Sequence, residues 1–329
     1  MSSWTPERIM ETSRAFMESR ILLTGAELNV FTHLCGPPKS LEEVAGLLYT
    51  SVRGTAILLD ALAAMGVVCK TDGRYTCPPE HAKVLSADSP GTALPMLRHM
   101  ASIWGRWSGL TDAVRVGTVD CTPEIFHDPE EIESFISAMH VIGQKLAVSI
   151  AERCEAAGST NLLDVGGATG TYAEAFLRRY PTMRATIFDR PEVIELARKR
   201  LGQTDLMPRI ALAAGNFYED EFPGGHDLVL LSAIIHQNSP EQNVELYKKS
   251  FRALVSGGRI LIRDHIMEVD RTQPPAGAIF AINMLVATAS GDCYTFDEIE
   301  STLTAAGFTE ARLIQTGRAM DGLIEAYKR

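Results

Sequence analysis

The sequence lacks any long apolar segment. No apolar run reaches the roughly 18 residues that indicate a transmembrane helix. The N-terminus, MSSWTPERIMETSR, also lacks the basic region and following apolar region of a signal peptide. These absences argue against membrane association, and we expect a cytoplasmic location.

Paired cysteines are lacking as well. No C-x-x-C pair occurs, and no group of cysteines and histidines has the spacing of a zinc site. We therefore expect free thiols in a reducing compartment, and no metal. The six cysteines are Cys35, Cys69, Cys77, Cys121, Cys154 and Cys293.

The chain has no basic excess. Lys and Arg total 31 against 41 Asp and Glu, so the net charge is −10. This balance disfavours nucleic acid as a partner, because binding phosphates requires a concentrated basic face. Hydrophobic residues make up 46% and charged residues 22%, which is typical of a globular protein. A length of 329 residues predicts about two domains.

The first part of the chain has the pattern of a small helical domain. Thr5-Pro6 predicts a helix start, and Ser40 with Glu43 forms a capping box. A second helix is predicted over 52–65, followed by a hairpin with Asp72-Gly73 at its turn. Helix, helix and hairpin in this order indicate a winged helix.

A winged helix raises the question of DNA binding. The helix after the turn, SVRGTAILLDALAAMG, carries one basic residue, Arg53, whereas a helix in the major groove normally carries several. Packing or dimerisation is therefore the favoured role. The first helix would expose Ile9, Phe16 and Leu22 in a monomer, which predicts a homodimer.

Further helices are predicted over residues 92–150. Asp128-Pro129 marks the start of a helix that contains Phe135 and Met139. The segment 116–127 is predicted to be a loop or hinge.

The pattern changes at Asn161, where short apolar segments begin to alternate with helices. This alternation predicts an α/β fold with a mainly parallel sheet covered by helices on both faces. The predicted strands are 162–165, 185–188, 210–213, 227–231, 259–263, 311–315 and 323–327.

A small-residue loop, Gly166–Gly170, follows the first of these strands. Ligands of open parallel sheets bind beyond the carboxyl ends of the strands, where this loop lies. Asp189 follows Gly166 by 23 residues, which suits a carboxylate that binds ribose hydroxyls. A dinucleotide is disfavoured, because Ala168 stands at the second glycine of G-x-G-x-x-G.

Several segments together resemble one family. LLDVGGATGTYAEAFLRRYP is similar to the first motif of class I S-adenosylmethionine (SAM)-dependent methyltransferases, and FDRPEVI and AGNFYEDEFP resemble the second and third. LLSAIIH with SGGRILIRD resembles the catalytic stretch of the plant-type O-methyltransferases. That family includes caffeate and acetylserotonin O-methyltransferases and bacterial relatives. Its members join a winged-helix-like dimerisation domain to a C-terminal Rossmann-like domain.

The resemblance implies a domain plan and an activity. Residues 1–100 would form the dimerisation domain, 101–155 linker helices that line the acceptor pocket, and 156–329 the SAM-binding catalytic domain. The activity would be methyl transfer to a hydroxyl of a small molecule, for which an aromatic ring is expected. Two alternatives stay open. One is a C- or N-methyltransferase or a non-methylating relative, and the other is a winged-helix regulator with a ligand-sensing domain.

The resemblance also implies a cofactor role for eight residues. They are Asp164, Gly166, Gly167 and Gly170 at the methionine end of SAM, Asp189 at the ribose, Asn216 and Phe217 at the adenine, and Ser232 beside the sulfonium.

His236 matches the family's general base. It follows an apolar strand at its carboxyl end, from where an imidazole can reach a bound hydroxyl. Asp264 aligns with the family's glutamate that orients the base. The residues expected to line the acceptor pocket are Met139, His140, Phe280, Asn283 and Met284.

The chain departs from the family pattern at several of these positions. Ala168 replaces a glycine, and Asn216 replaces an aspartate. Gln237-Asn238 stands where relatives commonly have Asp-Trp, and Cys293-Tyr294 where many have Glu-Arg.

Overall fold

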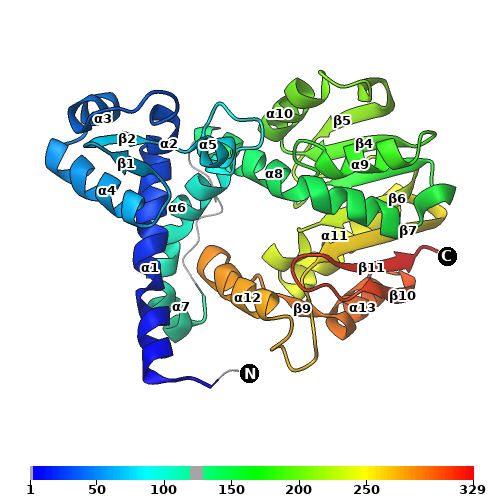
Figure 1. Cartoon of the computed structure of the whole chain (residues 1–329). Coiled ribbons are helices and arrows are strands. Elements are labelled where there is room, and N and C mark those ends of the chain that lie inside the picture. The colour runs from blue at the N-terminus through cyan, green and yellow to red at the C-terminus, as the bar shows by residue number, and fades with distance from the viewer. Residues whose placement is uncertain (1–2, 119–128) are drawn as a thin grey trace. The chain divides into compact units, whose positions relative to one another are not determined.

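The protein is described by a computed structural model that covers residues 3–118 and 129–329 (Figure 1). The chain divides into two compact units. The first comprises Met1–Trp104 with Ser137–Val141, and the second comprises Gly105–Ile136 with Ile142–Arg329.

The first unit has the predicted order of helix, helix and hairpin. Thr5 caps the first helix by accepting a hydrogen bond from the Arg8 N–H, and the capping box of Ser40 and Glu43 is formed. The elements are α1 (Pro6–Glu27), α2 (Val30–His33), α3 (Leu41–Leu48), α4 (Val52–Ala64), β1 (Cys69–Thr71), β2 (Arg74–Thr76) and α5 (Pro79–Leu85).

The core of this unit lies between α1, α2, α4 and the hairpin. Phe31, Leu59, Leu62 and Tyr75 are among its fully buried or nearly fully buried side chains. Large apolar side chains on and beside α1 stay outside this core, with 48% to 64% of their surface exposed. These are Trp4, Ile9, Met10, Phe16 and Met17.

Three helices follow in the chain, α6 (Leu94–Ser108), α7 (Leu110–Val116) and α8 (Pro129–Arg153). Helices are therefore confirmed in this part of the chain. Most of the loop predicted over 116–127, and the cap predicted at Asp128, lie outside the described residues.

The second unit is built on a seven-stranded sheet, which agrees with the predicted α/β class. Its strand order is β10-β11-β7-β6-β3-β4-β5. The five strands from β7 to β5 are parallel, and β11 pairs antiparallel with β7 and with β10. The strands are β3 (Asn161–Val165), β4 (Arg184–Asp189), β5 (Ile210–Ala214), β6 (His226–Ser232), β7 (Leu254–Asp264), β10 (Thr309–Gln315) and β11 (Gly322–Tyr327).

Helices cover both faces of this sheet (Figure 1). Leu162 belongs to one apolar core, together with side chains of α8, α9 and α10, whereas Leu163 belongs to a second core with side chains of α11 and α13. Strands buried on both faces explain the continuous apolar runs in the sequence. The elements not yet named are α9 (Thr171–Arg179), α10 (Pro191–Leu201), α11 (Pro240–Ala253), α12 (Pro275–Ala287), α13 (Phe296–Ala305), β8 (Ile266–Met267), β9 (Tyr294–Thr295) and the 3-10 helices η1 (Ala156–Gly158), η2 (Met207–Arg209) and η3 (Ile235–Gln237).

No single helix within 3–118 and 129–329 is long and apolar enough to span a membrane. The bent pair Leu41–Leu48 and Val52–Ala64 has the length and composition of a span only when its two helices are taken together. In the same ranges, no group of three or more His, Cys, Asp and Glu side chains could hold a metal ion.

Candidate active site

The predicted cofactor and catalytic residues meet at one edge of the sheet. Because β3 to β7 are parallel, their carboxyl ends share that edge. Val165 pairs with Phe188, Asp189 with Ala214, and Ser232 with Arg263 in the strand register. The segments that follow these residues are the glycine loop, the loop after β5, and the turn with His236.

The loop after β3 needs glycine at two positions, both because of the backbone conformation and because of a close neighbouring side chain. Gly166 has a φ of +65°, and a Cβ there would lie 2.5 Å from the Ile234 side chain. Gly170 caps α9 with a φ of +79°, and a Cβ there would lie 2.5 Å from Ile187. Ala168 also has a positive φ, +49°, a conformation that glycine adopts more readily than alanine. Its amide is fixed by a carboxylate of the next strand.

That carboxylate is Asp189, at the end of β4. Its Oδ2 accepts a hydrogen bond from the Ala168 N–H, and its Oδ1 accepts one from the Arg190 N–H, both at 2.8 Å. Burial raises the pKa of this carboxyl, although the two N–H donors oppose the shift. Asp189 is only half-buried, and each oxygen keeps acceptor capacity for a ribose hydroxyl.

Asp164 lies beneath the glycine loop. Its Oδ2 accepts a hydrogen bond from the Ala173 N–H at 3.2 Å, while its Oδ1 is buried without a partner. Burial raises the pKa of the Asp164 carboxyl to about 7. A cationic group nearby would stabilise its ionised form, which fits the ammonium and sulfonium of SAM.

The loop after β5 supplies an aromatic side chain to the same edge. The Phe217 ring lies beside the glycine loop, since a Cβ on Gly166 would be 4.0 Å from it. The buried Lys249 ammonium donates to the Phe217 carbonyl at 3.0 Å. Asn216 uses its Oδ1 to accept from the Tyr218 N–H at 3.0 Å, so this oxygen already has one donor.

Ser232 ends β6 and is tied to the neighbouring strand. The Arg263 Nε donates to the Ser232 Oγ at 2.9 Å, and the Arg263 Nη1 donates to the Met320 carbonyl at 2.5 Å. The guanidinium also lies 5.1 Å from the centre of the Tyr172 ring. Sequence reasoning missed this buried arginine. The available clue was an arginine placed directly after the apolar run Ile260–Ile262 and directly before Asp264.

His236 and Asp264 form a pair. His236 lies on η3, and its Nδ1 is 2.9 Å from both carboxylate oxygens of Asp264 at the end of β7. His236 is 9% exposed and Asp264 is 1% exposed. The His265 N–H donates to the Asp264 Oδ1 at 2.8 Å.

The carboxyl of this pair is ionised. Burial would raise the pKa of Asp264, but the neighbouring His236, its hydrogen bond and the Arg263 guanidinium hold the pKa below the usual value. An ionised carboxylate can only accept hydrogen bonds, so the His236 Nδ1 carries a proton. In the neutral ring, the Nε2 then has a free lone pair and can accept a proton.

The predicted acceptor-pocket residues fall into two groups. Phe280 on α12 lies edge-on to His236, with ring centres 4.9 Å apart. Also on α12, the Asn283 Oδ1 accepts from the Trp107 Nε1 at 2.9 Å, and Met284 is buried. The other two predicted residues, Met139 and His140, lie on the part of α8 that belongs to the first unit.

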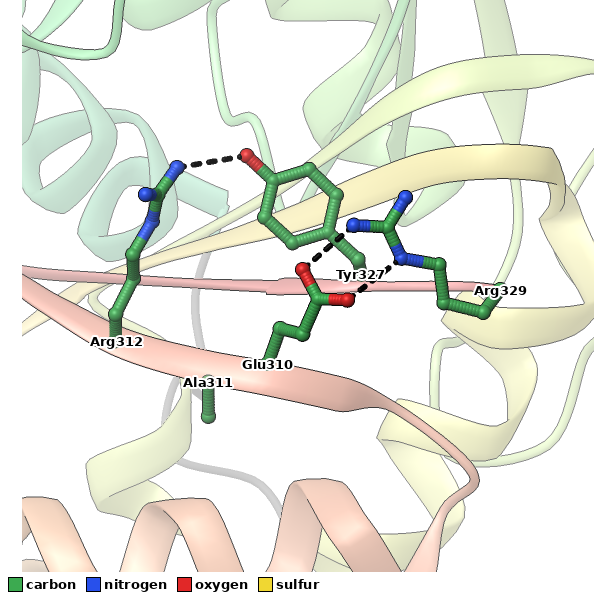
Figure 2. A pocket seen from close by; sticks show the side chains of 5 residues that line it. All are labelled: Glu310, Ala311, Arg312, Tyr327 and Arg329. Atoms are coloured by element: carbon green, nitrogen blue, oxygen red, sulfur yellow. Dashed lines mark hydrogen bonds and ion pairs between the residues drawn. The ribbon is translucent and has the colours of Figure 1, made fainter.

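A surface hollow of about 520 Å³ lies elsewhere on the second unit (Figure 2). Among its lining residues, the Arg329 guanidinium donates two hydrogen bonds to Glu310, at 2.9 and 2.5 Å, and the Arg312 Nη2 donates to the Tyr327 hydroxyl at 3.0 Å. Tyr327 pairs with Arg259, five residues before Asp264, which ends β7. The hollow therefore lies toward the amino ends of the parallel strands, whereas the predicted site lies at their carboxyl ends.

The sheet edge defines the class of protein. A glycine loop, the carboxylate that ends β4, an aromatic ring and a histidine–carboxylate pair lie together at the carboxyl ends of the parallel strands. In open α/β folds this edge of the sheet is where ligands such as nucleoside-containing cofactors bind.

Comparison with known proteins identifies the family. The O-methyltransferase domain matches residues 107–309, and the O-methyltransferase dimerisation domain matches residues 10–80. The chain therefore belongs to the O-methyltransferase family and is a SAM-dependent methyltransferase.

Individual relatives match along nearly the whole chain. A 3-hydroxy-5-methyl-1-naphthoate 3-O-methyltransferase from Streptomyces sahachiroi is 30% identical, with 94% of this chain and 91% of the relative covered. Acetylserotonin O-methyltransferase from Gallus gallus is 29% identical, with 97% and 96% covered. The crystal structure of human N-acetylserotonin methyltransferase in complex with SAM superposes with a TM-score of 0.85, at 26% identity and with 99% of each chain covered.

Proposed function

We propose that this enzyme transfers the methyl group of SAM to a hydroxyl of a small aromatic molecule, with His236 as the general base. The observation that carries this proposal is the His236–Asp264 pair at 2.9 Å, buried at the carboxyl edge of the sheet. It provides an oriented imidazole where an acceptor would meet the cofactor.

The cofactor roles follow from the contacts at the edge. Asp189 would bind the ribose hydroxyls, and Phe217 would pack on the adenine, with Asn216 beside it. Asp164 and the glycines 166, 167 and 170 would surround the methionine end. Ser232, held by Arg263, would lie beside the sulfonium. Bound SAM supplies an electrophilic methyl group on its sulfur.

Proton removal and alignment of the reacting atoms would depend on His236 and the residues around it. A phenol has a pKa of about 10 and is mostly protonated at neutral pH. The His236 Nε2 would remove the hydroxyl proton as the oxygen attacks, while the ionised Asp264 stabilises the resulting imidazolium. In-line attack also requires alignment of oxygen, methyl and sulfur, which the wall of the acceptor pocket would provide.

An aromatic acceptor fits the apolar wall beside the base. Phe280 packs against His236, and Asn283 and Met284 lie on the same face of α12. Trp107 of α6 adds an aromatic ring beside Asn283. The expected role of Met139 and His140 in binding the acceptor stays a prediction. Two relatives carry names that specify aromatic substrates, a naphthoate and acetylserotonin.

The test is methyl transfer from SAM to a panel of phenols, naphthols, hydroxyindoles and matched aryl amines. We expect methylated phenolic products, located by mass spectrometry and by the O-methyl resonance in NMR spectra. The matched methyl ethers, which have no free hydroxyl, should be inert. Methylation only at nitrogen or carbon would contradict the O-methyl proposal and favour the alternative acceptor atom.

We also propose a homodimer. The dimerisation-domain match starts within α1, and Ile9 and Phe16 on that helix are 51% and 53% exposed. Exposed apolar side chains grouped on one helix favour burial against a second copy. The cytoplasmic location and the domain limits at residues 100 and 155 stay predictions.

Substituting Phe16→Glu is expected to weaken the dimer by roughly 100-fold or more, because each of two symmetric copies loses about 1.5–3 kcal/mol of apolar burial. Sedimentation velocity at micromolar concentration should then show monomer. The control is Val269→Glu, an exposed apolar residue (81%) outside the dimerisation-domain match. A wild-type chain that sediments as a monomer would contradict the proposal.

A further inference from the structure

The turn that carries His236 is anchored by one buried asparagine. Asn238 lies two residues beyond the base and is fully buried. The Tyr218 hydroxyl donates to its Oδ1 at 2.7 Å, and the Tyr294 hydroxyl donates to its backbone carbonyl. Its own Nδ2 donates to the Asn243 Oδ1 at 3.0 Å. Such a satisfied, buried polar group fixes the local backbone.

The hydrogen bonds continue to the residue before the base. The Asn243 Nδ2 donates to the Ile235 carbonyl at 3.0 Å, and the Asn238 N–H donates to the same carbonyl at 3.3 Å. Ile235 directly precedes His236. A chain of side-chain hydrogen bonds therefore runs from the Tyr218 hydroxyl to the backbone of η3.

The other end of this chain lies at the adenine side of the site. Tyr218 follows Phe217, and their ring centres are 4.5 Å apart. One helix holds both ends, because α11 carries Lys249, which binds the Phe217 carbonyl, and Asn243, which binds the turn with the base.

A second tyrosine ties the same asparagine to the segment after Asp264. The Tyr294 hydroxyl donates to the Asn238 carbonyl across 56 positions of sequence. The short parallel pairing of β8 and β9 places Tyr294 opposite Ile266, two residues beyond Asp264. The turn that carries His236 is thus also linked to the segment that carries its carboxylate partner.

We propose that Asn238, held by Tyr218, is a positioning residue that makes the alignment of His236 depend on occupancy of the adenine side. The inference rests on the proposed roles of His236 and Phe217. An adenine packed on Phe217 restrains Tyr218, whose hydroxyl fixes Asn238 and thereby the turn. Because methyl transfer depends on alignment, loss of this link lowers kcat more than cofactor affinity.

The test is Tyr218→Phe, which removes the hydroxyl and keeps the ring against Phe217. Tyr218 is 51% exposed, so the change opens no core. Loss of one hydrogen bond to a buried group predicts a fall in kcat of roughly fivefold to tenfold. The KM for SAM and the Kd for S-adenosylhomocysteine should stay within about twofold. Tyr327→Phe, which removes a hydroxyl at the opposite edge of the sheet, is the matched control and should leave kcat unchanged.

A spectroscopic measurement tests the coupling itself. In ¹⁵N-histidine NMR spectra, S-adenosylhomocysteine should shift the His236 resonances of the wild type, assigned with His236→Asn, and Tyr218→Phe should lose that shift while still binding the ligand. The inference is overturned by an unchanged kcat, by a KM that rises as much as kcat falls, or by an unaltered shift. Failure of the proposed general base would appear separately, as a fully active His236→Asn enzyme.

Discussion

Replacing His236 by asparagine is expected to lower kcat by roughly 10²–10⁴-fold, the usual contribution of a general base. The Kd for S-adenosylhomocysteine, measured by titration calorimetry, should stay near the wild-type value, because His236 serves the acceptor and not the cofactor. The substitution removes the Nε2 lone pair, and the asparagine amide can still donate to the Asp264 carboxylate from near the Nδ1 position.

The choice of asparagine follows from the burial of the pair. Asp264 is 1% exposed and ionised, and the His236 Nδ1–H is its hydrogen-bond donor. His236→Ala is also expected to lose most methyl transfer. It would leave a buried carboxylate without that donor, which costs about 1–3 kcal/mol of stability or more. A loss of activity in the alanine variant alone could therefore come either from the missing base or from a loss of folded protein.

The matched control is a second buried histidine, His226→Asn. Its Nε2 lies 3.0 Å from the Thr186 Oγ1, and His226 begins β6, at the far end of the strand from Ser232. This variant should keep kcat within about threefold of the wild type, whatever its melting temperature. A His236→Asn enzyme that also stays within threefold would show that another group removes the proton.

Much of the site was predictable because it obeys a rule of topology. The proposed cofactor and catalytic residues lie at the carboxyl ends of five strands or just beyond them, and parallel strands place their carboxyl ends together. The alternation of strands and helices predicted that arrangement, so Asp189, His236 and Asp264 could be assigned to one edge without a structure. The cap at Thr5, confirmed in α1, and the capping box at Ser40, confirmed in α3, likewise predicted helix starts from short sequence signals.

The supporting contacts were not predictable, because they join residues far apart in sequence and follow no period. Tyr294 reaches Asn238 across 56 residues, and Trp107 reaches Asn283 across 176. The two-residue strands β8 and β9, which bring Tyr294 into place, are too short to produce an alternating pattern. The strand predicted over 259–263 also begins earlier than expected. β7 starts at Leu254 and includes Gly257 and Gly258, which do not belong to an apolar run.

Replacing Asp189 by alanine is expected to raise the Kd for S-adenosylhomocysteine by roughly 100-fold or more. A hydrogen bond to a charged group contributes about 1.5–3 kcal/mol, and two ribose hydroxyls would lose such bonds. The variant also frees the Ala168 amide, whose bond to Asp189 holds the glycine loop in a conformation with a positive φ for alanine. At saturating SAM, kcat should fall much less than affinity, because His236 and Asp264 are unchanged.

A neighbouring charge provides the control that makes this result specific. Glu192 pairs with Arg190 at 3.1 Å, one residue from Asp189, and has no hydrogen bond to the loop. Glu192→Gln should therefore keep the Kd within about twofold, while removing one negative charge from the same region. Circular dichroism of both variants separates loss of binding from loss of fold. A folded Asp189→Ala enzyme that binds S-adenosylhomocysteine within threefold of the wild type would mean that the ribose is held elsewhere, and that the Asp189 carboxylate serves only to fix the loop.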